Sequence, residues 1–157
     1  MKVKTMADLA RLVGKKGIVE KYKQSSRAIY EKFEVQYGQA DISLDLKTLT
    51  YDWDVPDWVS GHADIAHGGM ISFIYDSMMG ILATARAFAK GRVAFTKELR
   101  IFYHAPLQTK GMAKVNSFVK EVHGSQLVIT SEIIDCSGKK TSSAEGIFVL
   151  KEVKKLK

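Results

Sequence analysis

The feature that most constrains this fold is a long apolar segment. The segment is too short, and too polar at its centre, to span a membrane. Residues 68 to about 89 carry apolar side chains in nearly all directions around a helix: Met70, Ile71, Phe73, Ile74, Met78, Met79, Ile81 and Leu82. A helix that is apolar around its whole circumference is typical of a buried helix. The most apolar stretch, residues 70–85, is shorter than the ~20 residues that cross a bilayer, and it contains Asp76. The segment therefore predicts a soluble fold whose other elements enclose one helix.

Alternating patterns on both sides of this helix predict the strands that enclose it. Before the helix, apolar and polar residues alternate in residues 33–37, 42–46 and 49–55, and Pro56 ends this region. The apolar–polar alternation shifts by one residue near Lys47, which predicts a bulge or a tight turn there. Residues 57–66 are predicted to form a loop. After the helix, four strands are predicted at residues 93–103, 112–122, 127–136 and 144–153, and short turns make the last three an antiparallel meander.

The order of these elements favours one α+β domain with an antiparallel sheet. Either the sheet wraps around the helix, or a second subunit covers the apolar surface that the sheet leaves open. Residues 5 to about 32 have apolar residues at helical spacing, interrupted by Gly14 and Gly17. We therefore predict an N-terminal helical extension at residues 1–32 and the main domain at residues 33–157.

The composition argues against disulfides, metal sites and a secretory signal. The single cysteine, Cys136, excludes an intrachain disulfide, and no Cys/His spacing predicts a zinc site or another metal site. The first residues contain no continuous apolar run of a secretory signal, so we expect a cytoplasmic protein. The net charge is +7, and its densest cluster is the tail Lys151, Lys154, Lys155 and Lys157. Such a tail is either a solvated end or a means of attracting a polyanionic ligand.

The small and polar residues of the apolar helix lie on one stripe. Gly69, Ser72, Asp76 and Gly80 are spaced three, four and four residues apart, and Ser77 and Thr84 flank them. A carboxylate among apolar residues needs a partner, because burying an unpaired charge costs several kcal/mol. One interpretation is that Asp76 caps a neighbouring backbone or pairs with Arg86, Arg92 or Arg100. The other is that Asp76 is a general base or nucleophile in a cleft lined by small residues.

The start of the helix adds a second candidate feature. His67, Gly68 and Gly69 stand where a loop becomes a helix, and the first N–H groups of a helix lack partners and carry the positive end of its dipole. Two glycines let a ligand oxygen approach these donors, which predicts an oxyanion hole for a carbonyl. The alternative is that the two glycines form only a tight turn.

The combined pattern resembles a known family. His67-Gly68-Gly69, with Asp76 nine residues after His67 in a buried helix followed by four strands, resembles the hotdog-fold thioesterases of the phenylacetyl-CoA type. The segment TKELRIFYHAP at residues 96–106 is also similar to the strand that follows the helix in that family. The resemblance covers about residues 33–153. It implies a hotdog fold, in which an antiparallel sheet wraps around one long central helix, and hydrolysis of acyl-CoA thioesters.

The resemblance also implies an assembly and a set of roles. Family members form homodimers whose sheets join edge to edge, often paired again into a dimer of dimers, with the active site across the interface. By this resemblance Asp76 acts as base or nucleophile, the Gly68 N–H of the other subunit polarises the thioester carbonyl, His67 orients the loop, and Thr96 lies near the attacking water. The candidate substrate-binding residues are Gly69, Ser72, Ser77, Gly61 and His62. No cofactor is implied, apart from the coenzyme A of the substrate.

Three positions depart from the family pattern. Many relatives carry Asn or Gln about six residues before the histidine, where this chain has Gly61, and His62 or Asp64 are the candidates to replace that side chain. A basic residue often precedes the proline equivalent to Pro106, and here the sequence is His104-Ala105. Strand parity places Thr96 on the face opposite Phe95 and Leu99, so a place in the site requires a bulge or a position that faces an interface.

Two further functions remain open from the sequence. A hotdog hydratase or dehydratase would use a catalytic histidine in a different loop motif, which this chain lacks. A non-catalytic acyl-CoA-binding module or regulator is compatible with the basic composition and the helical extension. The basic residues of that extension do not form a recognition helix, so neither nucleic acid nor a membrane is an expected partner.

Overall fold

The structure is a computed structural model, described for residues 40–152. The predicted helical extension at residues 1–32, the alternating residues 33–37 and the last residues of the basic tail lie outside the described residues. None of the helices within residues 40–152 has both the length and the apolar character needed to cross a membrane.

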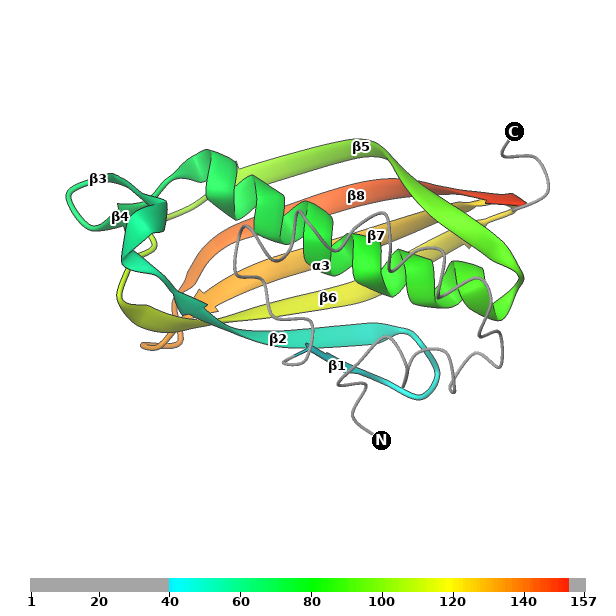
Figure 1. Cartoon of the computed structure of the whole chain (residues 1–157), viewed down its shortest axis with the longest axis horizontal. Coiled ribbons are helices and arrows are strands. Elements are labelled where there is room, and N and C mark those ends of the chain that lie inside the picture. Colours follow the sequence, from blue (N-terminus) through cyan, green and yellow to red (C-terminus); the bar gives the residue numbers. More distant parts are fainter. Residues whose placement is uncertain (1–39, 153–157) are drawn as a thin grey trace.

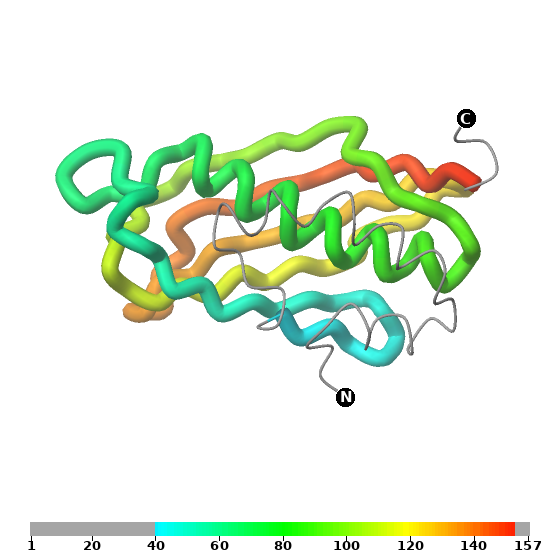
Figure 2. Tube along the Cα trace, in the orientation of Figure 1, coloured from blue at the N-terminus to red at the C-terminus, as the bar shows by residue number. Residues whose placement is uncertain are grey.

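One long helix and eight strands make up the described part of the chain (Figures 1 and 2). In chain order they are β1 Ala40–Ile42, β2 Thr48–Val55, the short 3₁₀ helix η2 Asp57–Val59, β3 Ser60–His62, β4 Ile65–Ala66, α3 Gly68–Ala89, β5 Arg92–Tyr103, β6 Gly111–His123, β7 Gln126–Asp135 and β8 Lys140–Glu152. Six strands form one antiparallel sheet in the order β1-β2-β6-β7-β8-β5, and β3 and β4 form a separate hairpin. The sheet wraps around α3, which confirms the predicted α+β hotdog fold.

The core lies between the concave face of the sheet and α3. Tyr75, Met78, Met79 and Leu82 of the helix have no exposed surface, and they meet alternate residues of the strands, such as Ile129 of β7. The prediction of a buried helix is therefore confirmed. Burying a side chain of this size stabilises a fold by about 1.5–3 kcal/mol relative to exposure, so this helix is a main contributor to the core.

Several boundaries differ from the prediction. The parity slip near Lys47 is a tight turn between β1 and β2, and Leu44 is exposed within it. Residues 57–66 contain η2 and the β3–β4 hairpin rather than a plain loop, because exposed β3 has no apolar alternation. Strand β8 begins at Lys140, four residues before the predicted start at residue 144, since its buried Thr141 and Ser142 are polar.

A bulge in β5 decides which of its side chains face the helix. Thr96 pairs with Phe148 and Glu98 pairs with Ile147, so Lys97 is an extra residue. An extra residue reverses the parity of the strand. Thr96, before the bulge, and Leu99, after it, therefore both face α3. This is the bulge that the sequence required if Thr96 was to take a place in the site.

Candidate active site

Asp76 and Thr96 form the centre of the first half of the candidate site. The Thr96 hydroxyl donates a hydrogen bond of 2.7 Å to Asp76 Oδ1. Asp76 is half-buried on α3, and Thr96 lies on β5, the last strand at one edge of the sheet. The bulge makes this contact possible, because it turns Thr96 toward the helix. A carboxylate held by one neutral donor keeps free lone pairs for a water or a substrate.

Asp76 has no ion pair within residues 40–152. Of the three arginines that the sequence offered as partners, Arg86 donates to the Leu46 carbonyl at 3.0 Å and Arg100 pairs with Glu98 at 2.6 Å. Arg92 forms no ion pair with Asp76 either, so the ion-pair interpretation of this carboxylate does not hold in the described part of the chain.

The start of α3 forms the second half, and only one of its N–H groups is open. His67 is the N-cap residue: its Nδ1 accepts from the Gly69 N–H at 3.0 Å, and its carbonyl accepts from Met70 and Ile71 at 2.9 and 3.1 Å. The Gly68 N–H has no acceptor within residues 40–152. Because an accepting Nδ1 carries no proton, the neutral His67 ring has its hydrogen on Nε2. The Gly69 N–H is thus taken by the cap, and Gly68 supplies the free donor.

Gly61 holds the His67 ring by leaving space for it. A Cβ on Gly61 would lie 2.9 Å from His67 Cδ2, which is too close for a real contact. The His67 N–H also donates to the Val59 carbonyl at 2.8 Å, so the segment before the helix fixes both the backbone and the ring of this residue. Gly61 therefore has a packing role here, in place of the amide side chain of many relatives.

The two candidates for replacing that amide lie elsewhere in the β3–β4 hairpin. Asp64 has a positive φ of 61° and pairs with Lys110 at 3.3 Å, and Lys110 also contacts Asp57 at 3.1 Å. These two carboxylates raise the pKa of Lys110, with Asp57 the larger cause. His62 is exposed. Neither His62 nor Asp64 contacts Asp76 within the described residues.

Tyr103 is a member of the site that the sequence reasoning missed. Its hydroxyl donates to the Gly68 carbonyl at 2.8 Å, the Ser72 hydroxyl donates to the same carbonyl at 2.9 Å, and the two hydroxyl oxygens are 3.0 Å apart. Together with the His67 cap, these bonds hold the Gly68–Gly69 peptide at its carbonyl and at its N–H. The alternation Leu99, Ile101, Tyr103 was the available signal, since it places Tyr103 on the helix-facing side of β5.

The polar stripe of α3 is only partly accessible. Gly69 is exposed and Ser72, Asp76 and Gly80 are half-buried, whereas Ser77 is only 3% exposed. The side chain of Ser77 therefore points into the core of its own chain and away from the surface that Asp76 shares with Thr96. His104, before Pro106, contacts the Ser143 hydroxyl at 2.8 Å on the outer side of the sheet.

The two half-sites, the start of α3 and the Asp76–Thr96 pair, lie at different levels of the helix. Gly68 and Asp76 are eight residues apart on α3, which corresponds to about 12 Å along its axis.

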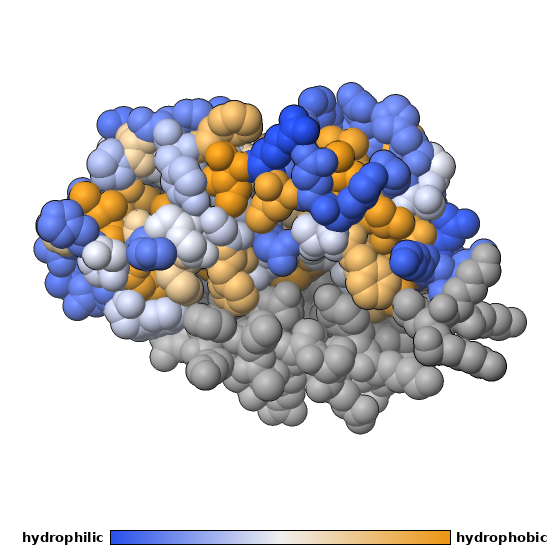
Figure 3. All heavy atoms as spheres, turned by 90° about the horizontal axis from the view of Figure 1, so that it is seen from above, coloured by the Kyte–Doolittle hydropathy of each residue, from blue (hydrophilic) through white to orange (hydrophobic). Residues whose placement is uncertain are grey.

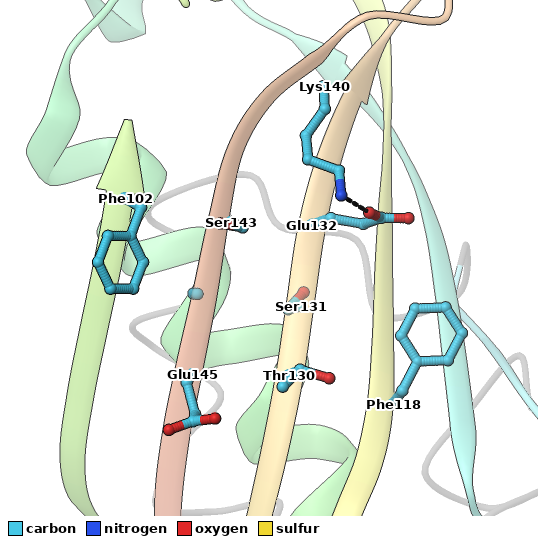
Figure 4. Close-up of a pocket in the computed structure, with 9 residues that line it drawn as sticks. Phe102, Phe118, Thr130, Ser131, Glu132, Lys140, Ser143 and Glu145 are labelled. Atoms are coloured by element: carbon cyan, nitrogen blue, oxygen red, sulfur yellow. Dashed lines mark ion pairs between the residues drawn. The ribbon is translucent and has the colours of Figure 1, made fainter. Parts of the chain in front are cut away.

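A pocket on the outer face of the sheet lies away from these half-sites. A depression of about 360 Å³ on the outer face of the sheet is flanked by Phe102 and Phe118 and contains the ion pair between Lys140 and Glu132 (Figure 4). The helix lies behind the sheet in this view, so the depression does not reach Asp76. Among the described residues, no group of three or more His, Cys, Asp or Glu side chains could hold a metal ion.

Comparisons with known proteins agree with this architecture. A sequence model of the thioesterase superfamily matches residues 63–142. A protein from Lactococcus lactis described as a thioesterase has a TM-score of 0.66 at 14% identity, over 72% of this chain and 90% of that chain. A hypothetical thioesterase protein from Streptococcus pneumoniae, solved with coenzyme A, has a TM-score of 0.61 at 14% identity, over 68% and 82%.

One further similar structure is longer than this chain. It is a thioesterase superfamily protein that is 22% identical with a TM-score of 0.61, and the match covers 70% of this chain but only 52% of that one, about half its length. A search of curated protein sequences found no match. At these identities the solved structures show a shared fold.

Proposed function

The chain belongs to the thioesterase superfamily, and we propose that it hydrolyses an acyl-CoA thioester to a free acid and coenzyme A. The observation that carries this proposal is the half-buried Asp76, which accepts a 2.7 Å hydrogen bond from Thr96 and has no ion pair in the described part of the chain. The open Gly68 N–H at the helix start supports it. Two similar folds were solved with coenzyme A or acetyl-CoA, from Streptococcus pneumoniae and Streptococcus mutans.

The proposed reaction is acyl transfer to water. Asp76 takes a proton from a water molecule while the water oxygen attacks the thioester carbon, and the Gly68 N–H stabilises the negative oxygen that forms. The tetrahedral intermediate then collapses, the C–S bond breaks, and coenzyme A leaves as its thiolate. In the alternative with Asp76 as nucleophile, its carboxylate attacks the thioester carbon, the C–S bond breaks and coenzyme A leaves as its thiolate, and water then hydrolyses the resulting anhydride. In both forms Thr96 positions the carboxylate.

The separation of the half-sites supports a homodimer. Since Gly68 and Asp76 of one chain are about 12 Å apart along α3, we propose that Asp76 acts with the partner's Gly68. This arrangement is the one that the family resemblance implies. It uses each half-site once and gives two identical active sites per dimer.

The replacement of Asp76 tests the proposed chemistry. Asp76→Asn keeps the shape of the side chain and removes its basicity, so we expect kcat to fall by at least about 100-fold, the size of general-base contributions. The matched control is Asp52→Asn, because Asp52 is an exposed carboxylate paired with Lys114 on another strand. Circular dichroism should show the same fold in both variants. Near-full activity of purified Asp76→Asn would exclude Asp76 as the base or nucleophile.

The acyl group is best identified by a panel of substrates. Short, medium, long and aromatic acyl-CoAs should be tested with a thiol-detecting assay, and we expect release of coenzyme A from at least one class. Binding of acyl-CoA without release of thiol from any member would favour the non-catalytic binding module instead.

A further inference from the structure

Two hydroxyl groups lie beside the open Gly68 N–H, one from the helix and one from the neighbouring strand. The Ser72 and Tyr103 hydroxyl oxygens are 3.0 Å apart, and they lie 2.9 and 2.8 Å from the Gly68 carbonyl oxygen. The end of β5 and the start of α3 meet here, at the same end of the molecule (Figure 1). Three oxygens from two elements therefore form one hydrogen-bonded group next to the proposed oxyanion donor.

The number of protons in this group determines what it can bind. A serine or tyrosine hydroxyl has one proton to donate and lone pairs that accept, whereas a backbone carbonyl only accepts. The three oxygens therefore share two protons. Whether both hydroxyls donate to the carbonyl or one hydroxyl donates to the other, both protons are used within the group. Only the remaining lone pairs of the two hydroxyl oxygens are left for a ligand.

These lone pairs are open to a ligand. Tyr103 is 53% exposed and Ser72 is half-buried, and within residues 40–152 no donor outside the group reaches either oxygen. By contrast, the Ser117 and Ser131 hydroxyls, 2.9 Å apart, are buried in the core. Seen from the β5 side, apolar and hydrophilic patches adjoin one another (Figure 3). Such a surface suits a ligand that combines an apolar chain with a hydrogen-bonding group.

The hydroxyl pair and the open N–H are close enough to bind one ligand at the same time. A Cβ on Gly68 would lie 3.3 Å from the Tyr103 hydroxyl oxygen. This oxygen is therefore within about 6 Å of the Gly68 nitrogen. A ligand that places a carbonyl oxygen on the N–H and a hydrogen-bond donor on the hydroxyls needs only a few bonds between these two groups.

A thioester substrate carries such donors on either side of its carbonyl. On the thiol side, the arm of coenzyme A has an amide N–H two methylene groups away from the sulfur. On the acyl side, a 3-hydroxyacyl group has an O–H close to the carbonyl. An ester oxygen in place of the amide N–H has no proton to donate, and it would bring its own lone pairs against those of the two hydroxyls.

We propose that Ser72 and Tyr103 form an acceptor subsite, which binds an N–H or O–H donor of the substrate next to its thioester carbonyl. The inference rests on the proposed function, because the Gly68 N–H is taken as the place where that carbonyl binds. The two hydroxyls then select between substrates in addition to holding the Gly68 peptide. A substrate without the donor is disfavoured, because it leaves the acceptors of the subsite unpaired.

Two pairs of matched substrates test the thiol side and the acyl side separately. On the thiol side, an acyl N-acetylcysteamine thioester is compared with the analogue in which an ester oxygen replaces the amide N–H. On the acyl side, a 3-hydroxyacyl thioester is compared with the same thioester without the hydroxyl. We expect kcat/KM of the unchanged protein to favour the donor by roughly tenfold in at least one pair, the size of one hydrogen bond. The pair that shows the preference identifies the source of the donor.

Removal of the two hydroxyl oxygens tests their part in this preference. Tyr103→Phe and Ser72→Ala remove one oxygen each, and in the double variant the ratio of kcat/KM within the pair should fall toward one. A purely structural role would lower kcat/KM of both substrates alike and leave the ratio unchanged. Ser143→Ala is the matched control and should keep the ratio, since its hydroxyl contacts His104 at 2.8 Å on the outer face of the sheet. An unchanged ratio in the double variant, or no preference in either pair, would overturn the subsite.

Equilibrium binding separates this proposal from the proposed function. Thioether ketones, in which a methylene group lies between the sulfur and the carbonyl, keep the carbonyl and the donor but cannot be hydrolysed. Calorimetry with the same pairs should show the preference for the donor and its loss in the double variant. If the protein hydrolyses no thioester but shows this binding preference, the function alone is contradicted. Hydrolysis without a preference in either measurement contradicts the subsite alone, and neither hydrolysis nor a binding preference contradicts both.

Discussion

At the scale of single residues, Gly61 shows how an absent side chain orders a site. Its Cα lies against the His67 ring, which caps α3 through the Gly69 N–H. We predict that Gly61→Ala displaces this ring, because the new Cβ would lie 2.9 Å from His67 Cδ2. Loss of the cap should lower the free energy of unfolding by about 1 kcal/mol, measured by urea denaturation. Because the cap orders the Gly68 donor, kcat should also fall.

Gly111→Ala is the matched control for this prediction. A Cβ on Gly111 would meet nothing within 4 Å, so stability and kcat should stay near those of the unchanged protein. Equal effects of the two substitutions, or none for Gly61→Ala, would show that the packing of Gly61 on His67 does not order the helix start.

The sequence predicted some of these residues better than others, for a physical reason. Asp76 and Gly68 could be proposed as site residues because each is conspicuous within a single helical pattern. The contacts of Gly61 and Tyr103 join segments that are separate in the sequence, and no local pattern encodes such contacts. Ser77 is next to Asp76 in the sequence, but adjacent residues are about 100° apart around a helix, so Ser77 faces the core and is only 3% exposed.

At the scale of elements, regular patterns predicted the fold and irregularities were missed. Helix α3 has the predicted start and end, because apolar residues on all sides leave few alternatives to a buried helix. The β3–β4 hairpin was not predicted, since it is held by backbone bonds such as Ala66 N–H to the Leu107 carbonyl and not by apolar side chains. The bulge at Lys97 was predicted only as one of two ways in which Thr96 could face the site. An alternating pattern shows that side chains change faces, but it does not show the backbone geometry that causes the change.

At the scale of the whole molecule, the proposed active site belongs to two chains, which a mixing experiment can test. Gly68→Pro removes the open N–H while keeping the helix start, because proline suits the first helical position and His67 already has the extended backbone that precedes proline, with ψ of 134°. We expect a loss of about 10²–10³-fold in kcat. Gly68→Ala is the matched control, since it adds a Cβ at the same place, 3.3 Å from the Tyr103 hydroxyl, and keeps the N–H.

Mixing Gly68→Pro with Asp76→Asn should restore activity that neither variant has alone. In a mixed dimer, the intact Asp76 of one chain meets the intact Gly68 of the other, so one of its two sites is complete. Random exchange makes half of the dimers mixed, and the recovered kcat should be about a quarter of that of the unchanged protein. A mixture of Asp76→Asn with Gly68→Ala is not informative on this point, because Gly68→Ala retains its donor. If exchange of subunits is shown by the change in dimer mass of a tagged chain and no activity returns, Asp76 and Gly68 do not act across the interface.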